Sequence, residues 1–310
     1  MRTRLILWAI AVALLVALPP FVSWLGQPFY IDLVRRIMIL AIAAVSLNLI
    51  LGYGGMVSFG HAAYLGIGAY AVGILGFYGI TSGWLHWALA IGASALAALA
   101  IGAVSIRTSG IYFIMITLAF TQMLYYLGIS LEEFGGDDGM RLRSKSEFAG
   151  LVDLRDPLEF YYLTLALMML SVFLVFRLVN SRFGMVLRAS KSNEARTRAI
   201  GFSPYPYRLA AFVIAGAMCG LAGALYANHT NYIVPGLMSW QQSGDIMFMV
   251  ILGGMASTAG PVLGTFALLL VEEVLKGWTE HWQVWLGPLL VLSVIFFRRG
   301  LAGIFYKPDA

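Results

Sequence analysis

The sequence predicts an all-α polytopic membrane protein with about 8–10 transmembrane helices. Of its 310 residues, 60% are hydrophobic and 11% are charged, against roughly a quarter charged residues in soluble domains. Apolar runs of roughly 20 residues recur along the chain, and this length crosses the hydrocarbon core of a bilayer. The net charge of +5 comes from basic residues in the loops between these runs. We therefore expect a partnership with the lipid bilayer and none with nucleic acid.

The apolar runs predict the helical spans in chain order. They cover residues 5–25, 33–51, 58–80, 84–106, 111–130, 159–179, 207–227, 240–257, 260–276 and 281–297. The first run follows Arg2 and Arg4 and resembles a secretory signal peptide, but the bulky residues after Pro19 and Pro20 favour an uncleaved span. The nearest alternative has two spans fewer, with re-entrant segments near residues 52–65 or 245–260.

The charges in the loops predict which loops face the cytoplasm. The segment from Arg177 to Arg208 contains seven basic residues and one acid, Glu194. Because cytoplasmic loops carry an excess of lysine and arginine, this segment is expected inside the cell. The 131–158 loop then falls outside. Arg35 and Arg36 also fall on the outer side, which is the main observation against this count of spans.

Two glycine-rich passages have similar sequences, which suggests a weak internal repeat. Gly54 to Ser58 reads GGMVS, and Gly253 to Ser257 reads GGMAS. Each follows an apolar run. Matching glycine-interrupted segments in two halves are typical of transporters whose pathway lies between the repeats. Chance similarity in so glycine-rich a chain is an equally good explanation.

The first of these passages contains candidate pathway or gating residues. Gly52 and Gly55 interrupt a helix at or near membrane depth, where irregular backbone is tolerated only inside protein or beside a wet cavity. Ser58 and His61 supply hydrogen-bonding groups just beyond the break, and Tyr64 follows. The alternative is a cytoplasmic turn with a serine cap and an interfacial histidine.

The second passage adds Gly253, Gly254 and Pro261 to the candidate pathway residues. Pro261 suits the first turn of a helix, where its missing N–H costs nothing. The acids Asp245, Glu272 and Glu273 flank this region. Acids inside a span are functional candidates by default, whereas near the span ends they are simply solvated. In the outer loop, Gly135 to Gly139 reads GGDDG and predicts a tight turn.

The basic segment is expected to contain one exposed helix. Residues from Met185 to Ile200 are rich in helix-forming types, and Gly201 is expected to end the helix. Pro204 and Pro206 are then expected to hold the chain extended into the next span. Such a segment could dock a soluble partner. The alternative is a basic surface attracted to anionic lipid headgroups.

No residue is assigned a catalytic, cofactor-binding or metal-binding role. The sequence has no phosphate-binding glycine loop of the Walker type, no CxxC and no HExxH. The four histidines are scattered without metal-ligand spacing. An enzyme is therefore the poorer interpretation.

Five sequence blocks resemble the permeases of the branched-chain amino-acid family of ABC importers. The blocks are Gly52–Tyr70, Gly135–Met140, Asn193 to Ala227, Gly253–Gly264 and Phe296–Phe305. They occur in the family's order and cover most of the chain. Within the family, the sequence is most similar to the M-type subunit.

This resemblance implies a single transmembrane permease domain over residues 1–310, in the bacterial inner membrane. Residues 131–158 would form an extracytoplasmic loop and residues 180–206 the loop that couples to an ATPase. Coupling residues would be Arg188, Asn193, Glu194, Ala195 and Gly201, although Arg196 departs from the family's consensus.

The implied partners are a homologous H-type permease, cytoplasmic ATPases that use the ATP, and a periplasmic substrate-binding protein. Transport would proceed by alternating access, with the substrate selected mainly by the binding protein. The alternatives are a urea or short-amide permease of the same family and an ion-coupled secondary carrier.

Overall fold

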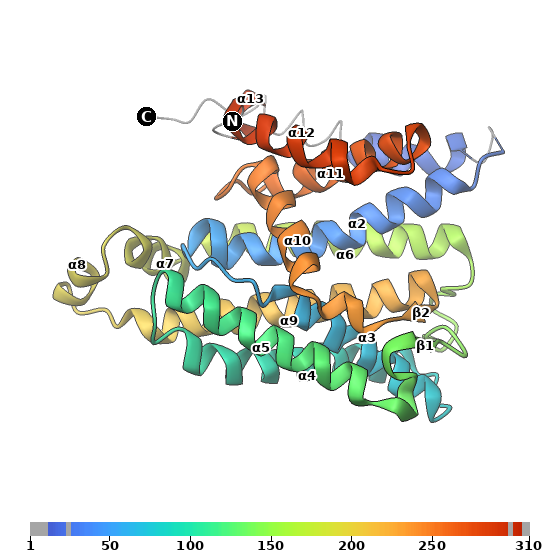
Figure 1. The fold of residues 1–310 in the computed structure, drawn as a ribbon, viewed down its shortest axis with the longest axis horizontal. Coiled ribbons are helices and arrows are strands. Elements are labelled where there is room, and N and C mark those ends of the chain that lie inside the picture. The colour runs from blue at the N-terminus through green and yellow to red at the C-terminus, as the bar shows by residue number, and fades with distance from the viewer. Residues whose placement is uncertain (1–11, 23–25, 297–299, 306–310) are drawn as a thin grey trace.

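The helices run side by side in a single bundle (Figure 1). The structure, a computed structural model, describes residues 12–22, 26–296 and 300–305. Within these residues, five helices are long and apolar enough to cross a membrane. They are α2 with its π-helical end η1 (Phe29–Tyr53), α4 (Gly83–Ser105), α5 (Ile111–Ser130), α6 (Pro157–Val179) and α9 (Pro204–Thr230). The predicted all-α polytopic fold is confirmed.

Shorter elements complete the bundle. The helices are Val12–Val22, α3 (His61–Phe77), α7 (Arg182–Ser192), α8 (Glu194–Ala199), α10 (Trp240–Gly253), α11 (Gly260–Trp278), α12 (Trp282–Phe296) and α13 (Ala302–Phe305). The 3-10 turns are η2 (Glu132–Phe134), η3 (Gly136–Asp138) and η4 (Pro235–Met238), and the strands are β1 (Met140–Arg141) and β2 (Tyr232–Ile233).

Every predicted span from 33–51 onward coincides with a helix, with shifted ends. The third begins at His61 rather than 58, and the eighth ends at Gly253 rather than 257. The first predicted span, 5–25, and the block Phe296–Phe305 lie partly outside the described residues.

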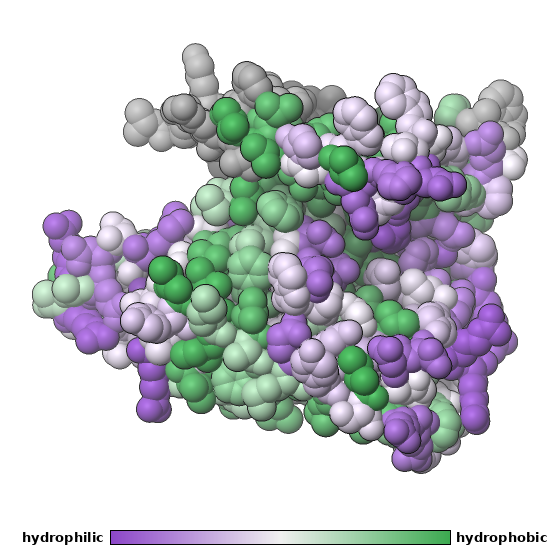
Figure 2. All heavy atoms as spheres, in the orientation of Figure 1, coloured by the Kyte–Doolittle hydropathy of each residue, from purple (hydrophilic) through white to green (hydrophobic). Residues whose placement is uncertain are grey.

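The two predicted loops lie at opposite ends of the bundle. Helices α7 and α8 project from one end, here called the coupling end, and β1 with β2 lies at the other, the outer end (Figure 1). On the face drawn in Figure 2, hydrophilic side chains gather at both ends, and a hydrophobic band lies between them. This distribution suits a bundle that crosses a bilayer along its long axis.

Helix α9 packs at the centre of the bundle against α2, α3 and α4. Small residues allow the close approach: a Cβ added to Gly68 of α3 would lie 2.0 Å from the carbonyl oxygen of Gly220 in α9. Small residues play this part in membrane helices generally, because lipid provides no hydrophobic force between helices.

Arg35 and Arg36 lie at the outer end, where their charges are paired within the fold. Arg35 is 5% exposed, forms an ion pair with Asp32, and donates from Nε to Nδ1 of His229 at 3.0 Å. Its Nη1 also reaches the carbonyl of the first residue of α6 at 3.4 Å. Arg36 lies 3.8 Å from Glu272. The arginines therefore have polar and acidic partners at the outer end. The exact count of spans stays a prediction.

The outer loop is fastened to the end of α9. Met140 pairs with Ile233 and Arg141 with Tyr232 in an antiparallel register. The predicted tight turn is confirmed, since Gly135, Gly136 and Gly139 all have positive φ angles of 91°, 51° and 80°. Further along the loop, burial and the nearby Arg35 guanidinium lower the pKa of Lys145.

Candidate functional site

The coupling-end loop consists of two helices, so the prediction of one helix over 185–200 is wrong. Asn193 has an extended backbone (φ −158°, ψ 106°) between α7 and α8. Its side-chain oxygen accepts a hydrogen bond from the Arg196 amide at 2.9 Å. An asparagine in this conformation begins a new helix because its side chain replaces a missing backbone acceptor. The predicted stop is confirmed: α8 ends at Ala199, and Gly201 follows with φ +91°.

The prediction that Pro204 and Pro206 hold the chain extended is also wrong. Both prolines lie in the first turn of α9. Amide groups in the first turn have no acceptor within the helix, so a proline there loses no hydrogen bond. The loop consequently passes directly into the central helix of the bundle.

Glu194 differs from the other predicted coupling residues. Arg188, Asn193, Ala195 and Gly201 are exposed at the coupling end. The Glu194 carboxylate is instead paired within the chain, with Arg198 at 2.6 Å and Arg208 at 2.7 Å. Arg208 in turn donates to the Ser190 carbonyl at 3.0 Å. The Glu194–Arg208 pair therefore braces α8 against the start of α9, and Arg208 connects both to α7.

The first glycine break is buried irregular backbone. Helix α2 ends in the π-helical turn η1 (Leu49–Tyr53), residues 54–60 are not helical, and α3 begins at His61. Gly54, Met56, Ser58 and Gly60 are buried there, as expected for irregular backbone at membrane depth. The segment folds back into the bundle, because His61 Nε2 lies 2.7 Å from Ser46 Oγ, about 10 Å from the end of η1 along the helix axis.

Lys191 of α7 joins the coupling-end loop to this break. Its ammonium donates a 2.7 Å hydrogen bond to the carbonyl of Gly52. The Lys191 side chain also passes over Gly55, where an added Cβ would lie 2.8 Å from Lys191 Cγ. Gly55 has φ +70°, a conformation that glycine adopts without steric cost. Two predicted pathway residues are therefore in direct contact with the predicted coupling loop.

The second glycine break lies directly beside the first. The Asn48 side chain accepts from the Ala256 amide at 3.0 Å and donates to the Ser257 carbonyl at 2.8 Å. Tyr53 and Thr258 add a hydroxyl contact at 3.5 Å. The two similar passages of the sequence thus meet at the coupling end.

Helices α10 and α11 cross closely at this second break. A Cβ on Gly253 would lie 1.8 Å from the carbonyl oxygen of Gly260, so only glycine fits there. Gly254 follows with φ +113°. Pro261 lies in the first turn of α11, as predicted.

Ser58, His61 and Tyr64 are fully buried in the core. The Ser58 hydroxyl accepts from the Gly60 amide at 3.1 Å. Tyr64 packs edge-on against His61 and Phe212, with ring centroids 5.8 and 5.9 Å away. Their role in a pathway stays a prediction.

The first turn of α10 begins at the exposed Trp240 and reaches the buried Ser243. Ser243 Oγ accepts from the amide of Ala62, in the first turn of α3, at 3.1 Å. The first turn of α3 and the first turn of α10 are therefore joined by a buried hydrogen bond.

The three acids near the second passage have different surroundings. Glu272 pairs with Lys276 at 2.5 Å and with Arg36 at 3.8 Å, which indicates a structural role. Asp245 is exposed on α10 and Glu273 is half-buried.

Sequence reasoning missed the residues that connect these parts, namely Lys191, Asn48 and Arg208. Asn48 offered a signal, since it is a lone amide at the end of an apolar run. Lys191 and Arg208 offered none that separates them from the other basic residues of the loop.

Comparison with known proteins identifies the family. The model of the family described as "Branched-chain amino acid transport system / permease component" matches residues 29–297. The chain belongs to this family. The match covers every span described above except Val12–Val22, and the structure bears out a multi-pass membrane protein.

Two similar relatives are M-type permeases. The high-affinity branched-chain amino acid transport system permease protein LivM of Salmonella typhimurium is 29% identical, over 87% of this chain and 69% of its own. LivM of Escherichia coli is 29% identical, over 95% of this chain and 74% of its own. The corresponding H-type permease, LivH of Escherichia coli, is 25% identical, over 85% of this chain and 91% of its own. No solved structure matches this chain.

Proposed function

We propose that this chain is the M-type permease subunit of an ATP-driven importer of branched-chain amino acids. It forms one half of the translocation pathway and pairs with a homologous H-type permease in the bacterial inner membrane. Family membership and the names of the LivM and LivH relatives support the substrate class and the paired subunit. ATP hydrolysis is assigned to separate cytoplasmic ATPases, so this chain needs no cofactor.

The observation that carries the proposal is the chain of contacts from the coupling-end loop to both glycine breaks. Lys191 of α7 holds the Gly52 carbonyl, and Asn48, one turn earlier on the same helix, holds the backbone at Ala256 and Ser257. A force applied to α7 would therefore reach α2 and the α10–α11 connection through direct hydrogen bonds.

These contacts suit alternating access. The exposed residues of the loop, including Arg188, Asn193 and Ala195, would dock the ATPase. When the ATPases close, α7 and α8 would move as one piece with the start of α9, because Glu194 and Arg208 fasten them together. Packed helices respond to such a push by switching between discrete arrangements. The breaks provide backbone that can change without unwinding a whole span.

At the outer end, we assign the 131–158 loop to docking of a periplasmic substrate-binding protein. The β1–β2 pairing holds this loop against the end of α9. The binding protein would select the substrate, and the permease would need no tight site of its own.

The test is purification in mild detergent, identification of the associated chains and reconstitution into vesicles. We expect an H-type permease and an ATPase to co-purify. Labelled leucine should then enter the vesicles only with ATP, the binding protein and both permeases, while labelled urea should not. Uptake of leucine by this chain alone, driven by an ion gradient, would instead indicate a secondary carrier. Uptake of urea in preference to leucine would refute the substrate class.

A further inference from the structure

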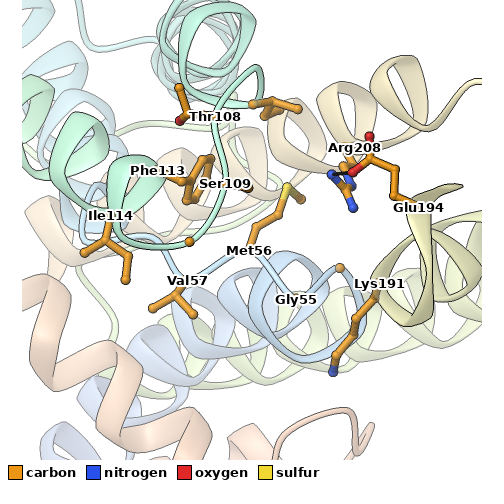
Figure 3. A pocket seen from close by; sticks show the side chains of 13 residues that line it. Gly55, Met56, Val57, Thr108, Ser109, Phe113, Ile114, Lys191, Glu194 and Arg208 are labelled. Carbon is orange, nitrogen blue, oxygen red and sulfur yellow. Dashed lines mark hydrogen bonds and ion pairs between the residues drawn. The ribbon is translucent and has the colours of Figure 1, made fainter.

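A cavity of about 180 Å³ lies at the coupling end. Its walls come from the first glycine break (54–57), the connection between α4 and α5 (106–110), the first turn of α5, and helices α7, α8 and α9 (Figure 3). The volume is larger than the roughly 150 Å³ of an engineered cavity that binds benzene. A ligand somewhat larger than six heavy atoms therefore fits.

One side of the cavity carries charges of both signs. Glu194 and Arg208 lie there together, 2.7 Å apart (Figure 3). The Arg208 side chain is only 16% exposed, and its Nε is buried without a hydrogen-bond partner among the described residues. A buried donor without a partner costs free energy, so a ligand oxygen that accepts from this N–H after a small shift of the Arg208 side chain would remove that cost. Lys191 adds positive charge at the same side, although its ammonium is held by Gly52.

The opposite side of the cavity is apolar. Val57, Phe113 and Ile114 lie across from the ion pair, and Met56 lies between the two sides (Figure 3). A hydrocarbon ligand would leave the Arg208 Nε without a partner and would cut the Glu194–Arg208 ion pair off from water, which is costly. An inorganic anion would face the Glu194 carboxylate and leave the apolar wall uncovered. The cavity is complementary to a small zwitterion that carries a short apolar chain.

We propose that this cavity binds a free α-amino acid with an apolar side chain on the coupling side of the permease. The carboxylate would accept from Arg208, the ammonium would lie against Glu194, and the side chain would cover Val57, Phe113 and Ile114. That this ligand is the imported product rests on the function proposed above. Binding itself requires neither ATP nor a partner chain.

An occupied cavity would restrain transport. The ligand would touch the coupling loop through Glu194 and the first glycine break through Val57, and so hold together two parts that must move during the cycle. Accumulated product would then slow its own import. Because coupling between sites is reciprocal, the state that closes the cavity would also release the amino acid.

The test measures binding to the purified full-length chain in nanodiscs by calorimetry. The probes are L-leucine, 4-methylpentanoate, which lacks the ammonium, 3-methylbutylamine, which lacks the carboxylate, glycine and inorganic phosphate. We expect L-leucine to bind at least tenfold more tightly than each of the others. Equal binding of phosphate or of 4-methylpentanoate would overturn the proposal, because the site would then recognise an anion alone.

Two variants test whether leucine binds in this cavity. Ser109 lines the cavity and is exposed, so Ser109→Trp should fill the cavity and abolish leucine binding. Ser130→Trp, at an exposed position on the outer end of α5, is the matched control and should bind normally. Arg208→Lys removes the Nε donor but keeps the charge, and should weaken leucine binding at least tenfold. Unchanged affinity in Ser109→Trp or in Arg208→Lys would locate leucine elsewhere and refute the proposal.

These measurements separate the two proposals. Failure of ATP-driven uptake leaves the binding result intact, and failure of binding leaves the uptake result intact. If both hold, leucine loaded inside the vesicles should slow uptake by the unaltered complex and not by the complex with Ser109→Trp. Equal slowing of both would show that product inhibition acts through another site.

Discussion

Replacing Lys191 with methionine should uncouple ATP hydrolysis from transport. The substitution removes the 2.7 Å hydrogen bond from the Lys191 ammonium to the Gly52 carbonyl and keeps most of the apolar stem. Hydrogen bonds that involve a charged group contribute about 1.5–3 kcal/mol. Lys191 is an exposed residue, so the lower value of about 1.5 kcal/mol applies. If this bond transmits the motion of α7 to α2, its loss should lower uptake per ATP roughly tenfold.

The assay compares leucine uptake with ATP hydrolysis in vesicles that contain the complete complex. Lys191→Met should retain hydrolysis and lose most uptake. Arg182→Met is the matched control, because Arg182 is an exposed basic residue on the same helix, whereas the bond to the break comes from Lys191. If Lys191→Met and Arg182→Met give the same uptake per ATP, the bond to Gly52 carries no coupling and the reasoning is wrong.

Three further changes test the other contacts at the coupling end. Gly55→Ala and Gly79→Ala share a positive φ, +70° and +79°, and an alanine there costs about 1–2 kcal/mol. Only Gly55→Ala also crowds Lys191, so it should reduce uptake well below the Gly79→Ala level, and equal uptake would contradict this. Asn48→Ala removes the bonds to Ala256 and Ser257 and should destabilise the protein by about 1–3 kcal/mol, measured as a lower unfolding temperature in detergent. An unchanged unfolding temperature would mean that these two hydrogen bonds contribute no stability. Glu194→Arg and Arg208→Glu should each impair uptake, and the double exchange should restore part of it, since the 2.7 Å pair re-forms with reversed charges. No recovery would argue against a bracing role.

The helices could be predicted from the sequence because lipid exposure produces long apolar runs that composition alone reveals. The exact ends could not, since they depend on single polar contacts. Asn193 breaks the coupling helix by capping α8, and asparagine occurs inside helices often enough that its presence alone does not indicate a break. The prolines were misread because the sequence does not show whether they lie before a helix or inside its first turn.

The candidate site was predictable only in part. The glycine breaks were visible as motifs, because their spacing interrupts apolar runs. The contact between the two breaks could not be predicted, since Asn48 and Ala256 are 208 positions apart and no local sequence pattern indicates such a contact. At the outer end, the contact of Arg35 could not be predicted for the same reason. Its partner His229 lies 194 positions away, so a count of basic residues treated a paired charge as a free one.

Helix α9 is one continuous helix that is long and apolar enough to cross a membrane. Its 27 residues extend about 40 Å. Its outer end continues into β2, which is paired with the outer loop, and its inner end carries Arg208, which is held by Glu194. A displacement of α9 along its axis would therefore move groups at both ends of the bundle. If the occupancy of the external receptor changes the affinity for nucleotide in the proposed assembly, nucleotide must change the affinity for the receptor by the same factor. In that assembly the helix would transmit the effect of nucleotide to the outer end and the effect of the receptor to the coupling end.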